Sequence, residues 1–240
     1  MNRWKAFAIH LTVSVAVFLA LLGVIITVWY PGILFNVDGG WNGLKLVMGV
    51  DVILGPLLTL IVYRVGKPGL KFDLSCIVSL QVACMLAGLW VVYQSRPIAL
   101  VFAYDTFYSL AANEFEAYGQ DPEVIGNFPG PSPKLIYTEL PDNDIGADVA
   151  NIRGFFMDDP LFMQTDRYQP IPEHGTAIFR RENAVRQDAE QMLRADVDTR
   201  EEGCVLGRFV SAYASGFVCY DPVTRNLTQF YASQSEREEP

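Results

Sequence analysis

The sequence predicts a membrane protein with three N-terminal transmembrane helices followed by an α+β domain. Residues 1–96 contain three apolar runs of about 20 residues, the length that a helix needs to cross a hydrocarbon core of roughly 30 Å. Residues 97–240 instead alternate short β-type and helical patterns. With 240 residues, 51% of them apolar, and a mean hydropathy of +0.21, the chain has room for both parts.

The first apolar run extends roughly from Ala6 to Tyr30 and follows the basic residues Arg3 and Lys5. A basic start is typical of a signal peptide, but a run of about 24 residues is long for one. The bulky sequence after it, WYPGILF, also lacks the small residues of a cleavage site. This run is therefore predicted to be an uncleaved signal anchor.

The second run, Leu46 to Tyr63, contains one carboxylate, Asp51, and the pair Gly55-Pro56. Proline removes a backbone donor and clashes with the preceding turn, so the pair predicts either a kink or a packing notch. The third run extends from Leu74 to Tyr93. Its aromatic end is typical of a membrane interface.

Basic residues predict the orientation of these helices. They lie before the first run and between the second and third runs, whereas the loop between the first and second runs is neutral overall. The positive-inside rule therefore places the N-terminus in the cytoplasm. Three crossings then deliver residues 97–240 to the other side, the periplasm of a bacterium with this protein in its inner membrane.

Three polar residues fall inside the apolar runs: His10, Asp51 and Gln81. Counted from the ends of the runs, Asp51 lies roughly 10 Å from the outer face and His10 about 6 Å from the cytoplasmic edge. Gln81 is closer in depth to His10, so neither residue is expected to reach Asp51. The interpretations are a proton or ion relay, contacts between the helices of this chain, or contact of Asp51 with a transmembrane helix of another protein. Three helices supply too few polar residues for a relay.

Residues 97–240 are predicted to form one periplasmic α+β domain that ends in an acidic, disordered tail. The strands are expected at 97–104, 134–140, 176–180, 204–213, 217–220 and 227–231, and the helices at 107–118, 144–157 and 181–197. The second helix carries an apolar stripe formed by Ile145, Val149, Ile152 and Phe156.

Cys204 and Cys219 are the only cysteines of this domain, and the periplasm favours disulfides. A bridge between them would close a loop of about 15 residues and contribute roughly 3 kcal/mol. A hairpin turn at Ser211-Ala212 would place the two cysteines opposite each other, whereas a turn at Ala214-Ser215 would not. The alternative is a pair of free, buried thiols.

No motif for catalysis, cofactor binding or metal binding is found in the sequence. It lacks a nucleophile elbow, an HExxH pair and a phosphate-binding glycine loop. His174 has no carboxylates at ligand spacing and is interpreted as a loop residue. The 24 acidic residues among 97–240, against 11 basic ones, argue against a nucleic-acid partner. We therefore expect a protein that is not an enzyme.

The N-terminal sequence resembles the bacterial type IV pilin accessory proteins, which are small inner-membrane proteins associated with the major pilin. The resemblance rests on RWKAFAIHL, WYPG, GVDVILGPLLTLIVY, GKPGLKFDLS and RPIALVFAYDTFY, and it covers roughly residues 1–110. It implies a role in assembling pilin into the pilus or in pilus dynamics. The family supplies no active-site residues.

A type IV pilin has an apolar helix in the bilayer and a globular head in the periplasm, and this chain would present a surface to each. The expected partners are therefore the lipid bilayer and the major type IV pilin. The competing hypothesis is a membrane-tethered periplasmic ligand-binding or sensor protein. Only about six residues and one short loop would face the cytoplasm to carry its output. A pilin-modifying enzyme is disfavoured by the missing motifs.

Overall fold

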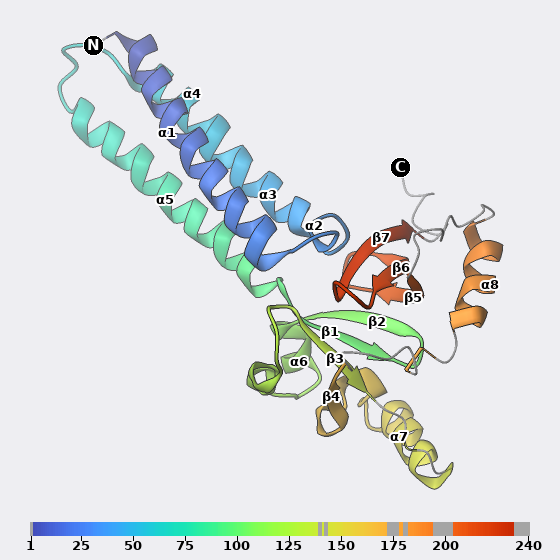
Figure 1. Cartoon of the computed structure of the whole chain (residues 1–240). Helices are drawn as coiled ribbons and strands as arrows, with labels where there is room; N and C mark the ends of the chain where they lie inside the picture. The colour runs from blue at the N-terminus through green and yellow to red at the C-terminus, as the bar shows by residue number, and fades with distance from the viewer. Residues whose placement is uncertain are drawn as a thin grey trace.

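The computed structural model describes residues 2–138, 141, 144–171, 178–179, 182–193 and 204–232. A bundle of long helices forms the N-terminal part, and a mixed β-sheet with short helices forms the remainder (Figure 1). The two parts meet where the last bundle helix runs into the first strand. The α+β architecture expected for the second part is confirmed.

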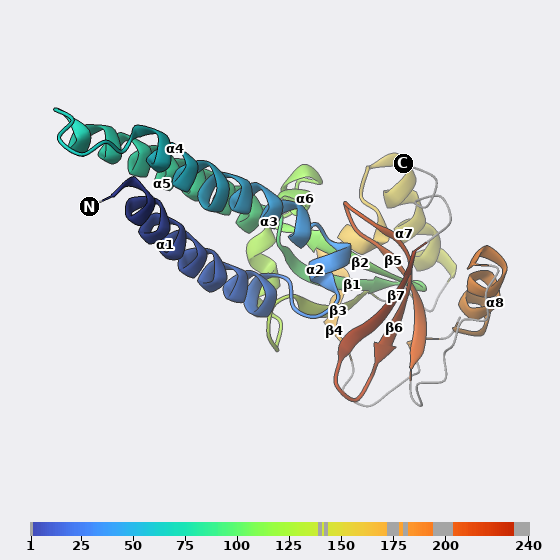
Figure 2. The same cartoon turned by 90° about the horizontal axis from the view of Figure 1, so that it is seen from above.

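The helical part contains apolar helices that lie side by side (Figures 1 and 2). In chain order they are α1 (Arg3–Val24), the π-helical η1 (Ile25–Trp29), α2 (Leu34–Val37), α3 (Gly40–Met48), the π-helical η2 (Gly49–Leu54), α4 (Gly55–Val62) and α5 (Leu70–Gln94). Two helices among the described residues, Arg3–Trp29 and Leu70–Gln94, are long and apolar enough to cross a membrane. The third expected span is a helical run whose apolar part, Asp51–Val62, is shorter.

The second part is built on a seven-stranded sheet in the order β4-β3-β1-β2-β5-β6-β7. The strands are β1 (Pro97–Ala103), β2 (Thr106–Ala111), β3 (Lys134–Thr138), β4 (Tyr168–Pro170), β5 (Val205–Val210), β6 (Ser215–Asp221) and β7 (Asn226–Ala232). β1 pairs with β3 in parallel and β2 with β5 in parallel, and the other pairs are antiparallel. The interior strand β1 is buried along its whole length, because both faces of the sheet are covered.

Short helices and loops cover the sheet. They include α6 (Ala112–Ala117), η3 (Pro122–Asn127), α7 (Asp144–Phe156), η4 (Leu161–Met163), η5 (Thr165–Arg167) and α8 (Glu182–Leu193). One core contains Phe102, Phe107 and Phe209 together with α2, and a second core contains Val101 of β1 and Phe115 of α6. The helix α2 thus belongs to the packing of the sheet, although α3, η2, α4 and α5 of the bundle follow it in the sequence.

The helix predicted over 107–118 is wrong in its first half, which forms β2. Tyr104 and Asp105 form a tight turn, with Tyr104 at a φ of 58°, and the chain returns antiparallel to β1. Phe107 then lies opposite Phe102 with ring centroids 4.7 Å apart. Such cross-strand aromatic pairs stabilise a hairpin, and here they outweigh the helical spacing of the apolar residues.

The three C-terminal strands form the expected antiparallel meander. The turn between β5 and β6 spans Ser211–Ala214, so Cys219 lies opposite Leu206 and neither expected register is found. Cys204 precedes β5 two residues before Leu206, and a disulfide joins it diagonally to Cys219 with the Cα atoms 5.5 Å apart. His174 and most of the predicted strand 176–180 lie outside the described residues.

Candidate functional site in the helical bundle

Polar side chains from three helical runs meet in the middle of the bundle. Ser14, Asp51 and Gln81 each lie eleven residues after the start of their runs, at Arg3, Gly40 and Leu70. At a rise of 1.5 Å per residue this places all three roughly 16 Å along their helices. All three are more than 90% buried, so they form one internal polar cluster.

Asp51 is the centre of this cluster. The amide Nε2 of Gln81 donates to Asp51 Oδ1 at 3.2 Å and to the Asp51 backbone carbonyl at 3.4 Å. The hydroxyl of Ser14 lies 3.5 Å from Asp51 Oδ1, at the limit of a hydrogen bond. A carboxylate away from water is costly unless donors surround it, and these two side chains supply them.

The local backbone explains why Gln81 binds a main-chain oxygen. Asp51 lies in η2, and in a π-helix a carbonyl accepts from the N–H five residues later. Five residues after Asp51 the chain has Pro56, which has no N–H. The Gln81 amide takes the place of that missing donor. The irregularity expected at Gly55-Pro56 thus takes the form of a π-helical segment followed by a new α-helix.

Gly55 is required by the same contact. A Cβ atom at this position would lie 1.8 Å from Gln81 Nε2, so any side chain would displace the amide. Gly49, in the same π-helical segment, has nothing within 4 Å of the equivalent position. The two glycines therefore have different functions, and only Gly55 makes room for α5.

A cleft with a volume of about 290 Å³ opens between α1 and α5 above the cluster. Its walls are apolar and include Val13, Val17 and Val82, and its floor contains Asp51 and Gln81. The Oε1 atom of Gln81 is buried and has no hydrogen-bond partner among the described residues. Gln81 therefore combines a place in the lining of the cleft with an acceptor that the described residues leave unused.

The expectation that Gln81 does not reach Asp51 is wrong. The second helical run begins at Gly40, before the strongly apolar sequence, so Asp51 lies deeper than a count from the apolar residues indicates. His10 does not bond Asp51 but pairs through Nδ1 with Thr59 Oγ1 at 2.6 Å. Sequence reasoning missed Ser14, although its position one turn after His10 on the same helix face was a usable signal.

A second buried carboxylate, Asp38, lies at the junction of the bundle and the sheet. The hydroxyl of Ser109, on β2, donates to Asp38 Oδ2 at 2.6 Å. Burial raises the pKa of Asp38 to about 6, and the nearby Glu114 carboxylate adds to this rise. The hydrogen bonds from Ser109 and Ser211 lower the pKa and offset part of the rise. No pattern in the sequence indicates the burial of this residue, because its partners are 71 or more residues away.

The segment around Asp38 is fixed to the sheet on both sides. Leu34 and Val37 of α2 are buried in the core of the sheet, and Ser211 donates to the Val37 carbonyl at 3.1 Å. Gly39 has a φ of +82°, and a Cβ atom there would lie 2.6 Å from the ring of Tyr213. This junction holds the orientation of the sheet relative to the bundle.

Comparison with known proteins identifies relatives among the fimbrial assembly proteins of Dichelobacter nodosus. The protein of serogroups C1 and C2 is 34% identical over 113 residues, which is 46% of this chain and 86% of the relative. This chain belongs to the family of fimbrial assembly proteins. The resemblance to the type IV pilin accessory family is thereby confirmed.

Two further fimbrial assembly proteins of that organism are longer. The proteins of serogroups E1 and I are each 36% identical, over 113 and 104 residues, which are 46% and 42% of this chain. The chain spans 44% and 40% of the length of these two relatives. No family model and no solved structure matches the chain.

Proposed function

We propose that this fimbrial assembly protein is a non-enzymatic accessory factor for type IV pilin. It promotes the assembly of pilin into pili, or pilus dynamics, through contacts with pilin in the inner membrane and in the periplasm. The names of three relatives support a role in fimbrial assembly. The contact with pilin rests on the geometry of the bundle.

In this proposal the chain crosses the inner membrane three times, with the N-terminus in the cytoplasm and the sheet in the periplasm. Two long apolar helices support two of the crossings. The third is the run from Gly40 to Val62, which is helical throughout and packs between α1 and α5 in the same bundle. The loop after this run contains Arg64, Lys67 and Lys71, and these basic residues favour a cytoplasmic position for it.

The observation that carries the proposal is the cleft between α1 and α5. Its apolar walls match the surface of a transmembrane helix, and helix association in a bilayer relies on close packing and hydrogen bonds between helices. The unpartnered Gln81 Oε1 offers an acceptor at mid-depth. A pilin helix with a small or polar donor residue at that depth would fill the cleft and satisfy this acceptor.

Site-specific photocrosslinking in intact cells tests the contact. A benzoylphenylalanine at Val82, a half-exposed residue in the wall of the cleft, should crosslink pilin. The matched control is Ile61 on α4, which is 71% exposed but does not line the cleft. Equal crosslinking from both positions, or none from Val82, would contradict the proposal.

Piliation and pilin mass distinguish this function from catalysis. Deletion of the protein should change the number of surface pili while the mass of pilin stays the same. A changed pilin mass would instead favour a modifying enzyme.

A second candidate function, a periplasmic ligand-binding or sensor protein, is favoured by one cavity. It has a volume of about 630 Å³ and lies where the bundle meets the sheet, with Ile33, Leu135 and Arg225 in its wall. Small-molecule sites commonly have this size. Native mass spectrometry of the protein released from detergent would test it. A stoichiometric small molecule that is lost in Leu135→Trp would favour this function.

A further inference from the structure

The helix α7 presents its apolar stripe to solvent instead of to the core. Ile145, Val149, Ile152 and Phe156 are between 47% and 83% exposed, and the neighbouring Phe155 is 87% exposed. The first four recur at the i, i+4, i+7 and i+11 positions of one helix face. An apolar face of this kind normally packs against a core, and an exposed one marks an interaction site.

The opposite face of α7 explains this inversion. Its small residues, Ala150 and Gly154, approach the rest of the domain, and a Cβ atom at Gly154 would lie 3.4 Å from Pro160 Cα. Polar contacts fix the helix further: Gln164 Nε2 donates to the Ala150 carbonyl at 3.0 Å, and Arg153 pairs with Asp159 at 2.6 Å. The stripe is therefore not needed to hold α7 in place.

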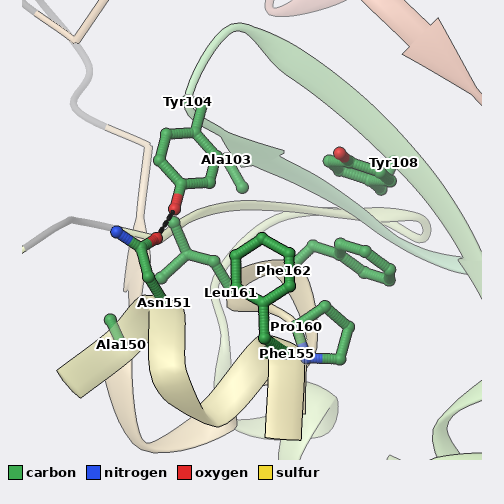
Figure 3. Close-up of a pocket in the computed structure, with 10 residues that line it drawn as sticks. Ala103, Tyr104, Tyr108, Ala150, Asn151, Phe155, Pro160, Leu161 and Phe162 are labelled. Atoms are coloured by element: carbon green, nitrogen blue, oxygen red, sulfur yellow. Dashed lines mark hydrogen bonds between the residues drawn. The ribbon is translucent and has the colours of Figure 1, made fainter. Parts of the chain in front are cut away.

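A pocket with a volume of about 280 Å³ lies between α7 and the β1–β2 hairpin, on the face of α7 that carries Ala150 and Gly154 (Figure 3). Phe155 and Phe162 line it, and Figure 3 shows the hydroxyl of Tyr104 directed at the side chain of Asn151, to which it donates at 2.6 Å. This hydrogen bond connects α7 to the β1–β2 turn and gives the pocket a fixed wall. None of the four stripe residues lines this pocket, so the stripe is a separate surface of α7.

The surroundings of the stripe are acidic. Arg153 is neutralised by Asp159 and Asp166, and the exposed Asp148 and Asp158 have no ion pair among the described residues. Two copies of this surface would repel each other through these carboxylates. In Figure 1, α7 also lies at the end of the sheet away from the bundle, which disfavours the bilayer as the occupant.

We infer that the apolar stripe of α7 binds an amphipathic helix of a partner protein, one with basic residues beside its apolar face. The helical spacing of the stripe suits the ridge of another helix. Asp148 and Asp158 face the Lys or Arg residues of that helix. The surface is distant from the bundle cleft, so this inference does not depend on the proposed function.

Peptide binding to the purified full-length protein in zwitterionic nanodiscs tests the inference. The probes are three fluorescein-labelled 18-residue peptides: an amphipathic Leu/Lys helix, a scrambled peptide of the same composition and a Leu/Glu amphipathic helix. Fluorescence anisotropy should show the Leu/Lys helix binding at least about tenfold more tightly than the other two, after subtraction of binding to empty nanodiscs. Equal binding of the scrambled peptide, or no binding, would overturn the inference.

Matched variants assign the binding to α7. The double substitution Ile152→Ser and Phe156→Ser keeps the charge and should weaken binding by about tenfold or more. Val223→Ser, in the β6–β7 turn and 87% exposed, should leave it unchanged. Unchanged binding by the double variant would overturn the inference, because the peptide would then be held by electrostatic attraction alone. Sedimentation would also overturn the inference if the wild-type protein formed a dimer and the double variant did not. The stripe would then serve self-association.

Discussion

Asp51 and Asp38 are both buried carboxylates, but their surroundings differ. Asp51 is held by side chains of the two other bundle helices and borders an open cleft. Asp38 is enclosed between a loop and the sheet, where Ser109 donates to it at 2.6 Å. The first carboxylate thus lies beside a cleft of the bundle, whereas the second connects two parts of the same chain.

This difference separates recognition from architecture. A polar group that serves the fold should have its hydrogen bonds completed within the chain, as at Asp38. The mid-bundle cluster leaves Gln81 Oε1 without a donor among the described residues. We therefore expect substitutions at the junction to change stability, and conservative substitutions at the cluster to change pilin engagement.

The largest effect should come from the pH dependence of the junction. Because the pKa of Asp38 is raised to about 6 in the folded protein, the folded state holds this proton more tightly than the unfolded state. Stability should therefore fall as the pH rises from about 4 to about 7, by up to roughly 3 kcal/mol. Hydrogen exchange of the β2 amides would report this loss.

Asp38→Asn is the control for this measurement. The amide oxygen can still accept from Ser109, but the side chain no longer ionises. The difference in exchange between wild type and variant should thus grow across that pH range, while titrating groups that do not interact with Asp38 contribute equally to both proteins and cancel. A constant difference would show that Asp38 is not the titrating group.

The next effect concerns the close approach of α4 and α5. Gly55→Ala would place a methyl group on the Gln81 amide and should destabilise the bundle by about 1–3 kcal/mol, the usual cost of overpacking. Gly49→Ala, with open space around it, should change stability by less than about 1 kcal/mol in either direction. Thermal unfolding in detergent compares the two. Equal destabilisation would mean that the glycines act through backbone flexibility.

Much of the architecture could be predicted from the sequence, because it depends on local patterns. The apolar runs, the first strand and the C-terminal meander follow from periodicity and turn residues. The depth of Asp51 could not, because the helix begins at Gly40 in a sequence that is only partly apolar. Burial of Asp38 depends on Ser109, and the outward face of α7 depends on how its small residues pack. These are tertiary contacts, which one chain segment does not encode.

The smallest effect on stability, and the most informative for function, is expected from Asp51→Asn. The substitution keeps the shape of the side chain and an oxygen for the Gln81 amide, so stability should change by about 1 kcal/mol or less. It also adds an NH₂ donor to the cluster. Where this donor bonds the unpartnered Gln81 Oε1, it removes the acceptor that we assign to the pilin helix. Surface piliation should fall while the amount of inserted protein stays constant. Normal piliation would mean that Asp51 serves helix packing alone, like Asp38 at the junction.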